Sequence, residues 1–130
     1  MRFGLALLAV AAGGALGSAA RFAVGTWFAE RLGPGFPWGT LTINVTGSFL
    51  IGVVVTLATA RTGFGPYMRV FLATGVLGGY TTFSTFAYET YAFGVDGLYA
   101  RGAAYAFGSL VAGVLAAYAG VVAGRLAAGA

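Results

Sequence analysis

The side chains of this 130-residue chain that are suited to chemistry are amides, hydroxyls and guanidinium groups, and acids are scarce. The sequence contains no Cys and no His, and its acidic residues are Glu30, Glu89 and Asp96. It therefore offers no disulfide framework, no Cys/His metal site and no histidine acid–base chemistry. So few acids do not favour paired-carboxylate hydrolysis, and we expect no enzymatic activity. The basic residues are all scattered arginines, which does not support a nucleic-acid-binding stripe.

Asn44 is the first candidate for ion chemistry, and it lies in the polar run 42–48. On a helix, Asn44 and Ser48 are four residues apart and face the same way. An amide in the middle of a bilayer is costly without partners. Asn44 therefore either joins two helices or offers its N–H donors to an anion, and the sequence leaves these interpretations equal.

The segment 75–86 combines a glycine pair with a run of hydroxyl side chains. This composition predicts a helix that breaks in the membrane, with free backbone carbonyls that can bind a cation. In the alternative interpretation the helix is continuous, Gly75 and Gly79 pack against a neighbour, and the hydroxyls bond back to their own helix. The residues that indicate the break are Gly78, Gly79, Thr81, Thr82, Ser84 and Thr85.

Two pairs of residues at helical spacing extend this set. Phe83 and Phe86 are three apart and share a helix face, where a ring edge can approach an anion or the rings can simply pack. Tyr105 and Ser109 are four apart and either continue a track of donors or, for Tyr105, anchor the helix at the membrane interface.

Two charged residues have competing interpretations. Arg21 either extends its side chain to the interface or concentrates anions at a vestibule. Glu89 follows Tyr88 near the end of an apolar run and has the pattern of a solvated helix end. We expect no acidic residue inside a membrane span.

The elements that must position these residues are membrane helices. The composition is 59% hydrophobic and 8% charged, with a mean hydropathy of +0.89, whereas soluble domains average about 25% charged residues. Uncharged runs over 3–20, 32–60, 70–88 and 102–124 are each close to or above the roughly 20 residues that cross a bilayer. Residues 1–20 also resemble a signal peptide, but the apolar pattern continues to Phe28. We predict one all-α domain over 1–130, with transmembrane helices at about 3–28, 38–60, 68–93 and 101–125.

The arginines give little preference for either orientation in the membrane. Four spans place both termini and the second connection on one side, and the positive-inside rule compares the two sides. With so little bias, the chain either inserts both ways, which permits antiparallel pairing of two copies, or keeps one weakly specified orientation. The first side holds Arg2, Arg61, Arg69 and Arg125, and the other holds Arg21, Arg31 and Arg101.

Three motifs together resemble the CrcB-type (Fluc) fluoride channels of bacteria. They are Gly14-Ala-Leu-Gly-Ser-Ala-Ala-Arg21-Phe22, Gly39-Thr-Leu-Thr-Ile-Asn44-Val-Thr-Gly-Ser48-Phe49 and Gly78-Gly-Tyr-Thr-Thr-Phe-Ser-Thr-Phe86. The resemblance covers essentially the whole chain. It implies a multi-pass protein of the bacterial inner membrane that forms a homodimer of two inverted copies. It also implies two pores that pass fluoride passively out of the cell.

The resemblance also implies roles for individual residues. Gly113 stands where the donor track on the last helix would continue, and it brings no side-chain donor. A structural sodium ion at the dimer centre would be held by the backbone carbonyls of Gly78 and Thr81, with Arg21 and Glu89 at a vestibule. The expected pore and fluoride-binding residues are Asn44, Phe83, Ser84, Thr85, Phe86, Tyr105 and Ser109.

Two other functions compete with this interpretation. A small dual-topology, proton-coupled multidrug exporter also has four short helices, but it usually depends on a carboxylate within the membrane, and none is expected here. A structural or assembly protein would use the glycine-rich helices for packing alone and would leave Asn44, Phe83 and Phe86 without a role.

Overall fold

In the computed structural model, which describes residues 1–60 and 64–129, every regular element is a helix. This confirms the prediction of an all-α chain. Four helical stretches are long and apolar enough to cross a membrane, and the third is assembled from four shorter pieces. The elements are α1 (Phe3–Leu32), α2 (Trp38–Thr59), α3 (Pro66–Arg69), the π-helix η1 (Val70–Leu77), α4 (Gly78–Tyr80), α5 (Phe83–Val95) and α6 (Tyr99–Ala128).

The observed spans are generally longer than the predicted ones. The first helix continues from the expected end near Phe28 to Leu32, and Gly33 then ends it with φ of +70°, a conformation that suits glycine. The last helix begins at Tyr99 and runs to Ala128, where Gly129 has a left-handed conformation. The charged residues near the helix ends lie within the helices because their long side chains reach water from the terminal turns.

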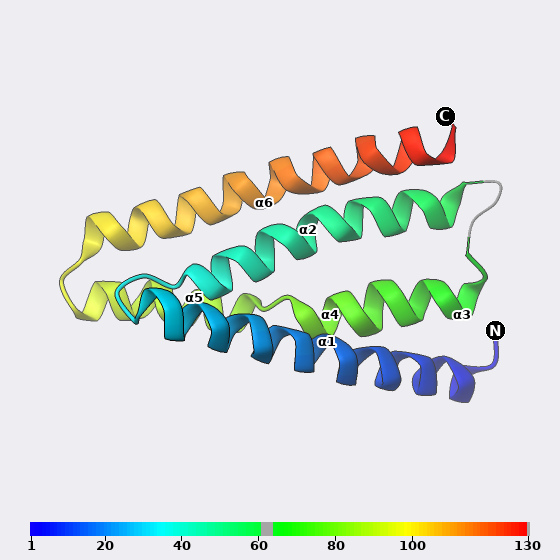
Figure 1. The fold of residues 1–130 in the computed structure, drawn as a ribbon, viewed down its shortest axis with the longest axis horizontal. Coiled ribbons are helices and arrows are strands. Elements are labelled where there is room, and N and C mark those ends of the chain that lie inside the picture. Colours follow the sequence, from blue (N-terminus) through cyan, green and yellow to red (C-terminus); the bar gives the residue numbers. More distant parts are fainter. Residues whose placement is uncertain (61–63, 130) are drawn as a thin grey trace.

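Consecutive spans run in opposite directions, so the two termini lie at the same end of the molecule (Figure 1). The helix α2 packs along α6, and α1 packs along η1 and α4. The connection between α1 and α2 and the connection between α5 and α6 lie at the opposite end (Figure 1).

Glycines allow these helices to approach each other closely. A Cβ atom on Gly17 would clash with the carbonyl oxygen of Val76, and one on Gly120 would clash with the carbonyl oxygen of Phe49. Small residues at such contacts let helix backbones touch, which is the main source of helix association in lipid. The glycine richness of the sequence thus serves the α1–η1 and α2–α6 interfaces.

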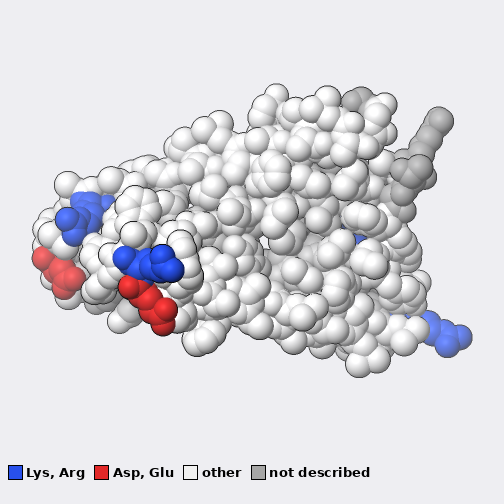
Figure 2. Space-filling model, viewed as in Figure 1, with Lys and Arg blue, Asp and Glu red and all other residues white. Residues whose placement is uncertain are grey.

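The surface between the two ends of the molecule is almost uncharged. On the face shown in Figure 2, most of the charged atoms lie toward the two ends. Arg2, Arg69 and Arg125 belong to helix ends beside the termini, and Arg31 and Arg101 belong to the opposite end. Arg61, which entered the comparison of the two sides, lies outside the described residues.

The third span is interrupted at Thr81 and Thr82. Both residues have extended backbone, with ψ of 158° for Thr81 and φ of −149° for Thr82, and the span as a whole bends by about 20°. The expected interruption is therefore present, directly after the short helix that holds the glycine pair. The close glycine packing of the alternative interpretation is present too, because a Cβ on Gly75 would lie 2.9 Å from Cα of Gly13.

Candidate ion site at the helix interruption

Asn44 pairs with the backbone of Thr82 through two hydrogen bonds. The N–H of Thr82 donates to Asn44 Oδ1 over 2.8 Å, and Asn44 Nδ2 donates to the carbonyl oxygen of Thr82 over 3.0 Å. This pairing joins α2 to the interruption and sets which end of the amide is the acceptor. One hydrogen on Nδ2 keeps no acceptor within the described residues. Joining two helices and offering a donor are therefore compatible roles for Asn44.

The side chain of Thr82 caps α5. Its hydroxyl oxygen accepts the N–H of Thr85 at 3.3 Å, and its O–H donates to Thr85 Oγ1 at 3.0 Å. Threonine is a favoured cap in this extended conformation. Among residues 1–60 and 64–129, Thr82 is one of two buried polar residues, and sequence analysis gave it no individual role. A threonine at the start of a helix after a break is the signal that identifies such a cap.

These contacts divert two N–H groups from their usual helical acceptors. In a continuous helix the N–H of Thr82 would bond to the carbonyl of Gly78, and that of Thr85 to the carbonyl of Thr81. Both donors are taken elsewhere, and within the described part of the chain neither carbonyl accepts a hydrogen bond. Neutral peptide oxygens of this kind suit a hard cation. Gly78 and Thr81 thus fit the expected sodium site.

A cavity of about 530 Å³ lies beside the interruption, between α2 and α6. It brings together most of the expected pore residues. Ser109 lines it with a hydroxyl oxygen that is buried and has no hydrogen-bond partner among the described residues. Ser84 and Thr85 do not line the cavity and lie on the exposed side of α5. The lining includes Asn44, Ser48, Gly78, Thr81, Thr82, Phe83, Phe86, Ser109 and Gly113.

Phe83 and Phe86 form a pair at the edge of this cavity. Their ring centroids are 5.8 Å apart, and the ring of Phe86 lies 5.3 Å from that of Tyr105. Phe86 is held among other aromatic groups, whereas Phe83 is 79% exposed. The pair therefore spans the boundary between the interior and the outer surface of this chain.

Glu89 is bound by two hydroxyl groups from other helices. Tyr105 donates to Glu89 Oε2 over 2.7 Å, and Thr40 donates to Glu89 Oε1 over 2.8 Å. The expectation that Glu89 is a solvated helix end is wrong, because α5 continues to Val95 and both carboxylate oxygens accept hydroxyl groups of other helices. Two donors satisfy the carboxylate, which allows it to lie partly buried.

Tyr105 is the most deeply buried large side chain, with 2% of its surface exposed. Its ring contacts those of Phe36, Phe86 and Phe93 at centroid distances of 5.3–6.0 Å. The interpretation of Tyr105 as an interfacial anchor is therefore wrong. Thr40, the other residue that donates to Glu89, is the second buried polar residue of the described chain. Sequence analysis missed this contact because Thr40 and Glu89 are 49 positions apart.

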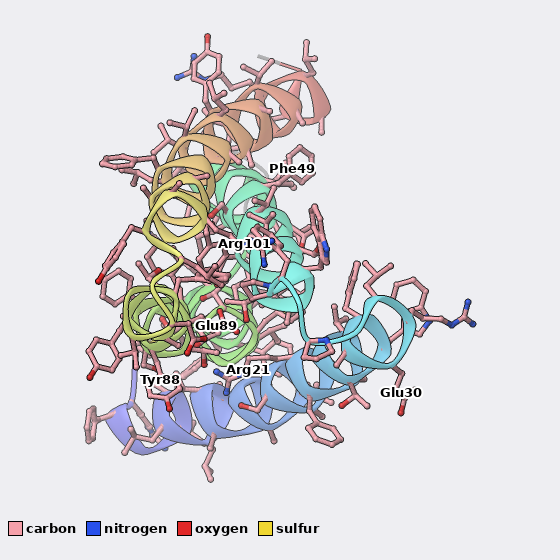
Figure 3. All side chains as sticks on the ribbon, turned by 90° about the vertical axis from the view of Figure 1, so that its left-hand side faces the viewer. Arg21, Glu30, Phe49, Tyr88, Glu89 and Arg101 are labelled. Atoms are coloured by element: carbon pink, nitrogen blue, oxygen red, sulfur yellow. The ribbon has the colours of Figure 1, made fainter. Side chains whose placement is uncertain are left out.

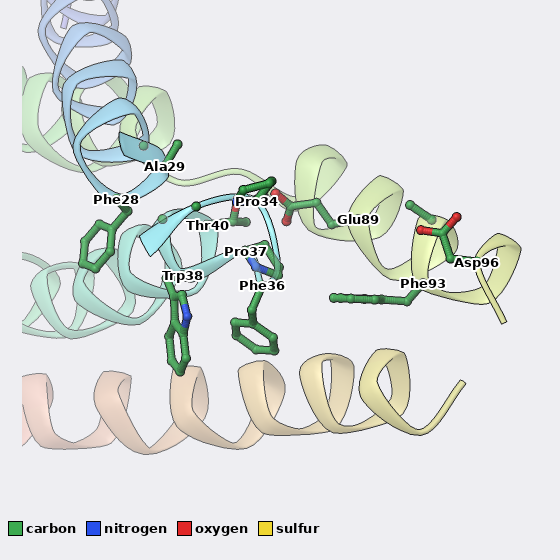
Figure 4. Close-up of a pocket in the computed structure, with 14 residues that line it drawn as sticks. Phe28, Ala29, Pro34, Phe36, Pro37, Trp38, Thr40, Glu89, Phe93 and Asp96 are labelled. Atoms are coloured by element: carbon green, nitrogen blue, oxygen red, sulfur yellow. Dashed lines mark hydrogen bonds between the residues drawn. The ribbon is translucent and has the colours of Figure 1, made fainter. Parts of the chain in front are cut away.

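A second cavity, of about 410 Å³, is lined in part by Glu89 (Figure 4). Phe28, Trp38 and Phe93 contribute apolar walls, and Asp96 lies with Glu89 among its lining residues. Phe36 and Phe93 line this cavity and also contact the ring of Tyr105, so the cavity reaches the aromatic cluster beside Glu89.

Arg21 lies apart from both cavities. It is half-buried on α1, and its side chain extends toward the third span in Figure 3. No ion pair or hydrogen bond of Arg21 is present among residues 1–60 and 64–129. The structure does not join it to the Asn44 or Glu89 clusters within one chain.

Comparison with known proteins places these features in a family. The family model described as "CrcB-like protein, Camphor Resistance (CrcB)" matches residues 8–121. A protein of Rhizobium meliloti (strain 1021) named "Fluoride-specific ion channel FluC" is 52% identical over 115 residues, which cover 88% of this chain and 92% of the relative. Proteins of the same name from Nitrobacter winogradskyi and Thermus thermophilus are 54% and 50% identical over 115 and 113 residues. These matches cover 88% and 87% of this chain, and 91% and 88% of the relatives.

Proposed function

Because the chain belongs to the CrcB-like family, we propose that this multi-pass membrane protein is a fluoride-selective channel that lets the ion leave the cell passively. The observation that carries the proposal is the set of uncharged donors beside an aromatic pair at the interruption of the third span. Asn44 offers an amide hydrogen, Ser109 offers a hydroxyl, and Phe83 and Phe86 offer ring edges.

This donor set suits a small, strongly hydrated anion. A selective pathway must replace the water around the ion, and N–H, O–H and ring-edge C–H groups all present positive hydrogens. Neutral donors hold an anion less tightly than a buried arginine would, so the ion is able to leave again. Arg21, apart from this cluster, is suited to attracting anions toward the entrance.

The pathway is completed by a second, inverted copy of the chain. Phe83 is 79% exposed in one copy, so an aromatic group assigned to the pathway needs a neighbour to enclose it. The arginines at the two ends, Arg2, Arg69 and Arg125 against Arg31 and Arg101, give little reason for one orientation. We therefore propose an antiparallel homodimer in the inner membrane, with two symmetry-related pores.

A sodium ion at the centre of this dimer would be held by the free carbonyls of Gly78 and Thr81 from both copies. When bound, the ion supplies positive charge and ties the two interrupted helices together. If this is correct, the purified protein unfolds at a higher temperature in sodium chloride than in N-methylglucamine chloride. Equal unfolding temperatures in the two salts would exclude a stabilising sodium site.

The channel function is tested by loading liposomes with fluoride and reconstituting the purified protein. A potassium ionophore lets potassium leave together with fluoride, so that no opposing membrane potential builds up. Fluoride release is followed with a fluoride electrode, and chloride release is measured in parallel. We expect rapid loss of fluoride and almost none of chloride. Equal rates for the two ions, or no release of fluoride, would overturn the proposal.

A proton-coupled multidrug exporter is the second candidate, because Glu89 places a carboxylate inside the third span. Both oxygens of this carboxylate are bound by hydroxyls of Thr40 and Tyr105, which does not favour a group that must release and bind protons each cycle. Ethidium uptake into proteoliposomes with an imposed pH gradient distinguishes the two, since the channel proposal expects none.

A further inference from the structure

We infer that Thr82 is the positioning residue of the interruption: it releases the carbonyls of its neighbours and determines which groups of Asn44 and Thr85 remain free to donate. The inference rests on the proposed channel function, because it assigns to Thr82 a purpose in that pathway. It concerns a residue that touches Asn44 by its backbone and Thr85 by its side chain.

The release of the carbonyls depends on two different parts of Thr82. Its N–H bonds to Asn44, which leaves the carbonyl of Gly78 free. Its hydroxyl oxygen takes the N–H of Thr85, which leaves the carbonyl of Thr81 free. One buried residue therefore controls both oxygens that fit a cation.

The same hydrogen bonds determine whether the remaining free groups of Asn44 and Thr85 are donors or acceptors. The oxygen of the Asn44 amide is occupied by Thr82, so the group that remains available is an N–H. Thr85 Oγ1 accepts the proton of Thr82, so the O–H of Thr85, which lies on the exposed side of α5 and outside the cavity, remains free to donate. Both free groups are donors, which an anion needs and a cation does not.

The packing of α2 supports a fixed interruption at this point. Gly47 lies one turn after Asn44, and a Cβ there would clash with the methyl group of Thr81. Thus α2 offers a hydrogen-bonding residue to Thr82 and an open space to Thr81 on the same face. Neither contact requires the hydroxyl of Thr82, so side-chain substitutions there test the cap separately from the Asn44 pairing.

The experiment compares Thr82→Val, which keeps the shape and removes the hydroxyl, with Thr82→Ser, which keeps the hydroxyl. Thr59→Val is the control, because the hydroxyl of Thr59 bonds only to carbonyls of its own helix, far from the interruption. Each variant is checked for assembly by size-exclusion chromatography. Fluoride release from liposomes and backbone hydrogen exchange of the peptide covering residues 83–86 are then measured.

We expect the Thr85 amide within this peptide to exchange about tenfold faster in Thr82→Val, since its N–H is the one that the Thr82 hydroxyl accepts and a lost helix cap weakens the first turn to about this degree. Fluoride release by this variant should fall about tenfold per assembled protein, as expected from the loss of one oriented donor. Thr82→Ser and Thr59→Val should stay within about twofold of the unaltered protein in both measurements, as expected when a cap is kept.

Three results would overturn the inference. One is a Thr82→Val variant whose exchange and release are unchanged, and another is faster exchange with full release, which would make the cap purely structural. The third is an equal loss of release in Thr82→Ser. These results are distinct from failure of the proposed function, which would appear as an unaltered protein that releases no fluoride.

Discussion

The hydroxyl of Tyr105 donates to the carboxylate of Glu89 over 2.7 Å, linking α6 to α5 inside the membrane span. On the other oxygen of the same carboxylate, Thr40 brings in the first turn of α2. Three helices thus meet at one acidic group, which also lines the cavity of about 410 Å³.

Removing the Tyr105 hydroxyl should loosen this junction. In Tyr105→Phe the ring and its aromatic contacts remain, while Glu89 loses one of its two donors. We expect a loss of about 1.5–3 kcal/mol in stability, typical of a hydrogen bond to a charged group, and reduced fluoride release. Thermal unfolding and liposome flux measure these effects. Tyr118→Phe, at an exposed position on the same helix, is the control and should change neither.

Asn44→Asp should suppress anion passage. The carboxylate can still accept the N–H of Thr82, but its second oxygen would face the carbonyl of Thr82 in place of a donor. The added charge also repels an anion. We expect fluoride release to fall by about tenfold or more, since a hydrogen bond of this class is worth about 1.5–3 kcal/mol. Release at the unaltered rate would remove Asn44 from the pathway.

The aromatic pair is tested by Phe83→Ile and Phe86→Ile. Isoleucine keeps the apolar character and removes the ring edge, so fluoride release should drop while the dimer still assembles. Phe107→Ile is a suitable control, because Phe107 is also highly exposed and lies outside both cavities. If both substitutions in the pair leave the release unchanged, the rings are not part of the pathway.

Gly120→Ala should destabilise the α2–α6 interface. The added methyl group would clash with the backbone carbonyl of Phe49, which cannot rotate away as a side chain can. We expect a loss of about 1–3 kcal/mol, as for other overpacked sites, measured by thermal unfolding in detergent. Gly108→Ala on the same helix has open space around it and should have little effect. A stability unchanged by Gly120→Ala would show that the interface adjusts freely.

The helices of this protein and the interruption of the third span were predictable from the sequence, because each depends on residues that are close together along the chain. Apolar runs gave the four spans, and the glycine pair with its hydroxyl run indicated the interruption near Thr81. Helical spacing brought Phe83 and Phe86 together correctly. None of these predictions requires knowledge of how two helices are rotated against each other.

The contacts of Thr40 and Thr82 depend on that rotation and were not foreseen. Thr40 meets Glu89 from 49 positions away, and Asn44 meets Thr82 from 38 positions away. The partners of Glu89 were missed for the same reason: a carboxylate is tolerated within a span where neighbouring helices provide donors, and the sequence does not show which helices are neighbours.

The oxygens exposed at the interruption belong to the peptide chain itself, so no side-chain replacement deletes them. Mutations can disrupt such a site only indirectly, by restoring a continuous helix or by separating the two helical segments. A scan that truncates each residue in turn to alanine would therefore not remove the carbonyl oxygens proposed to bind sodium, and would detect only the neighbouring residues that keep the helix interrupted.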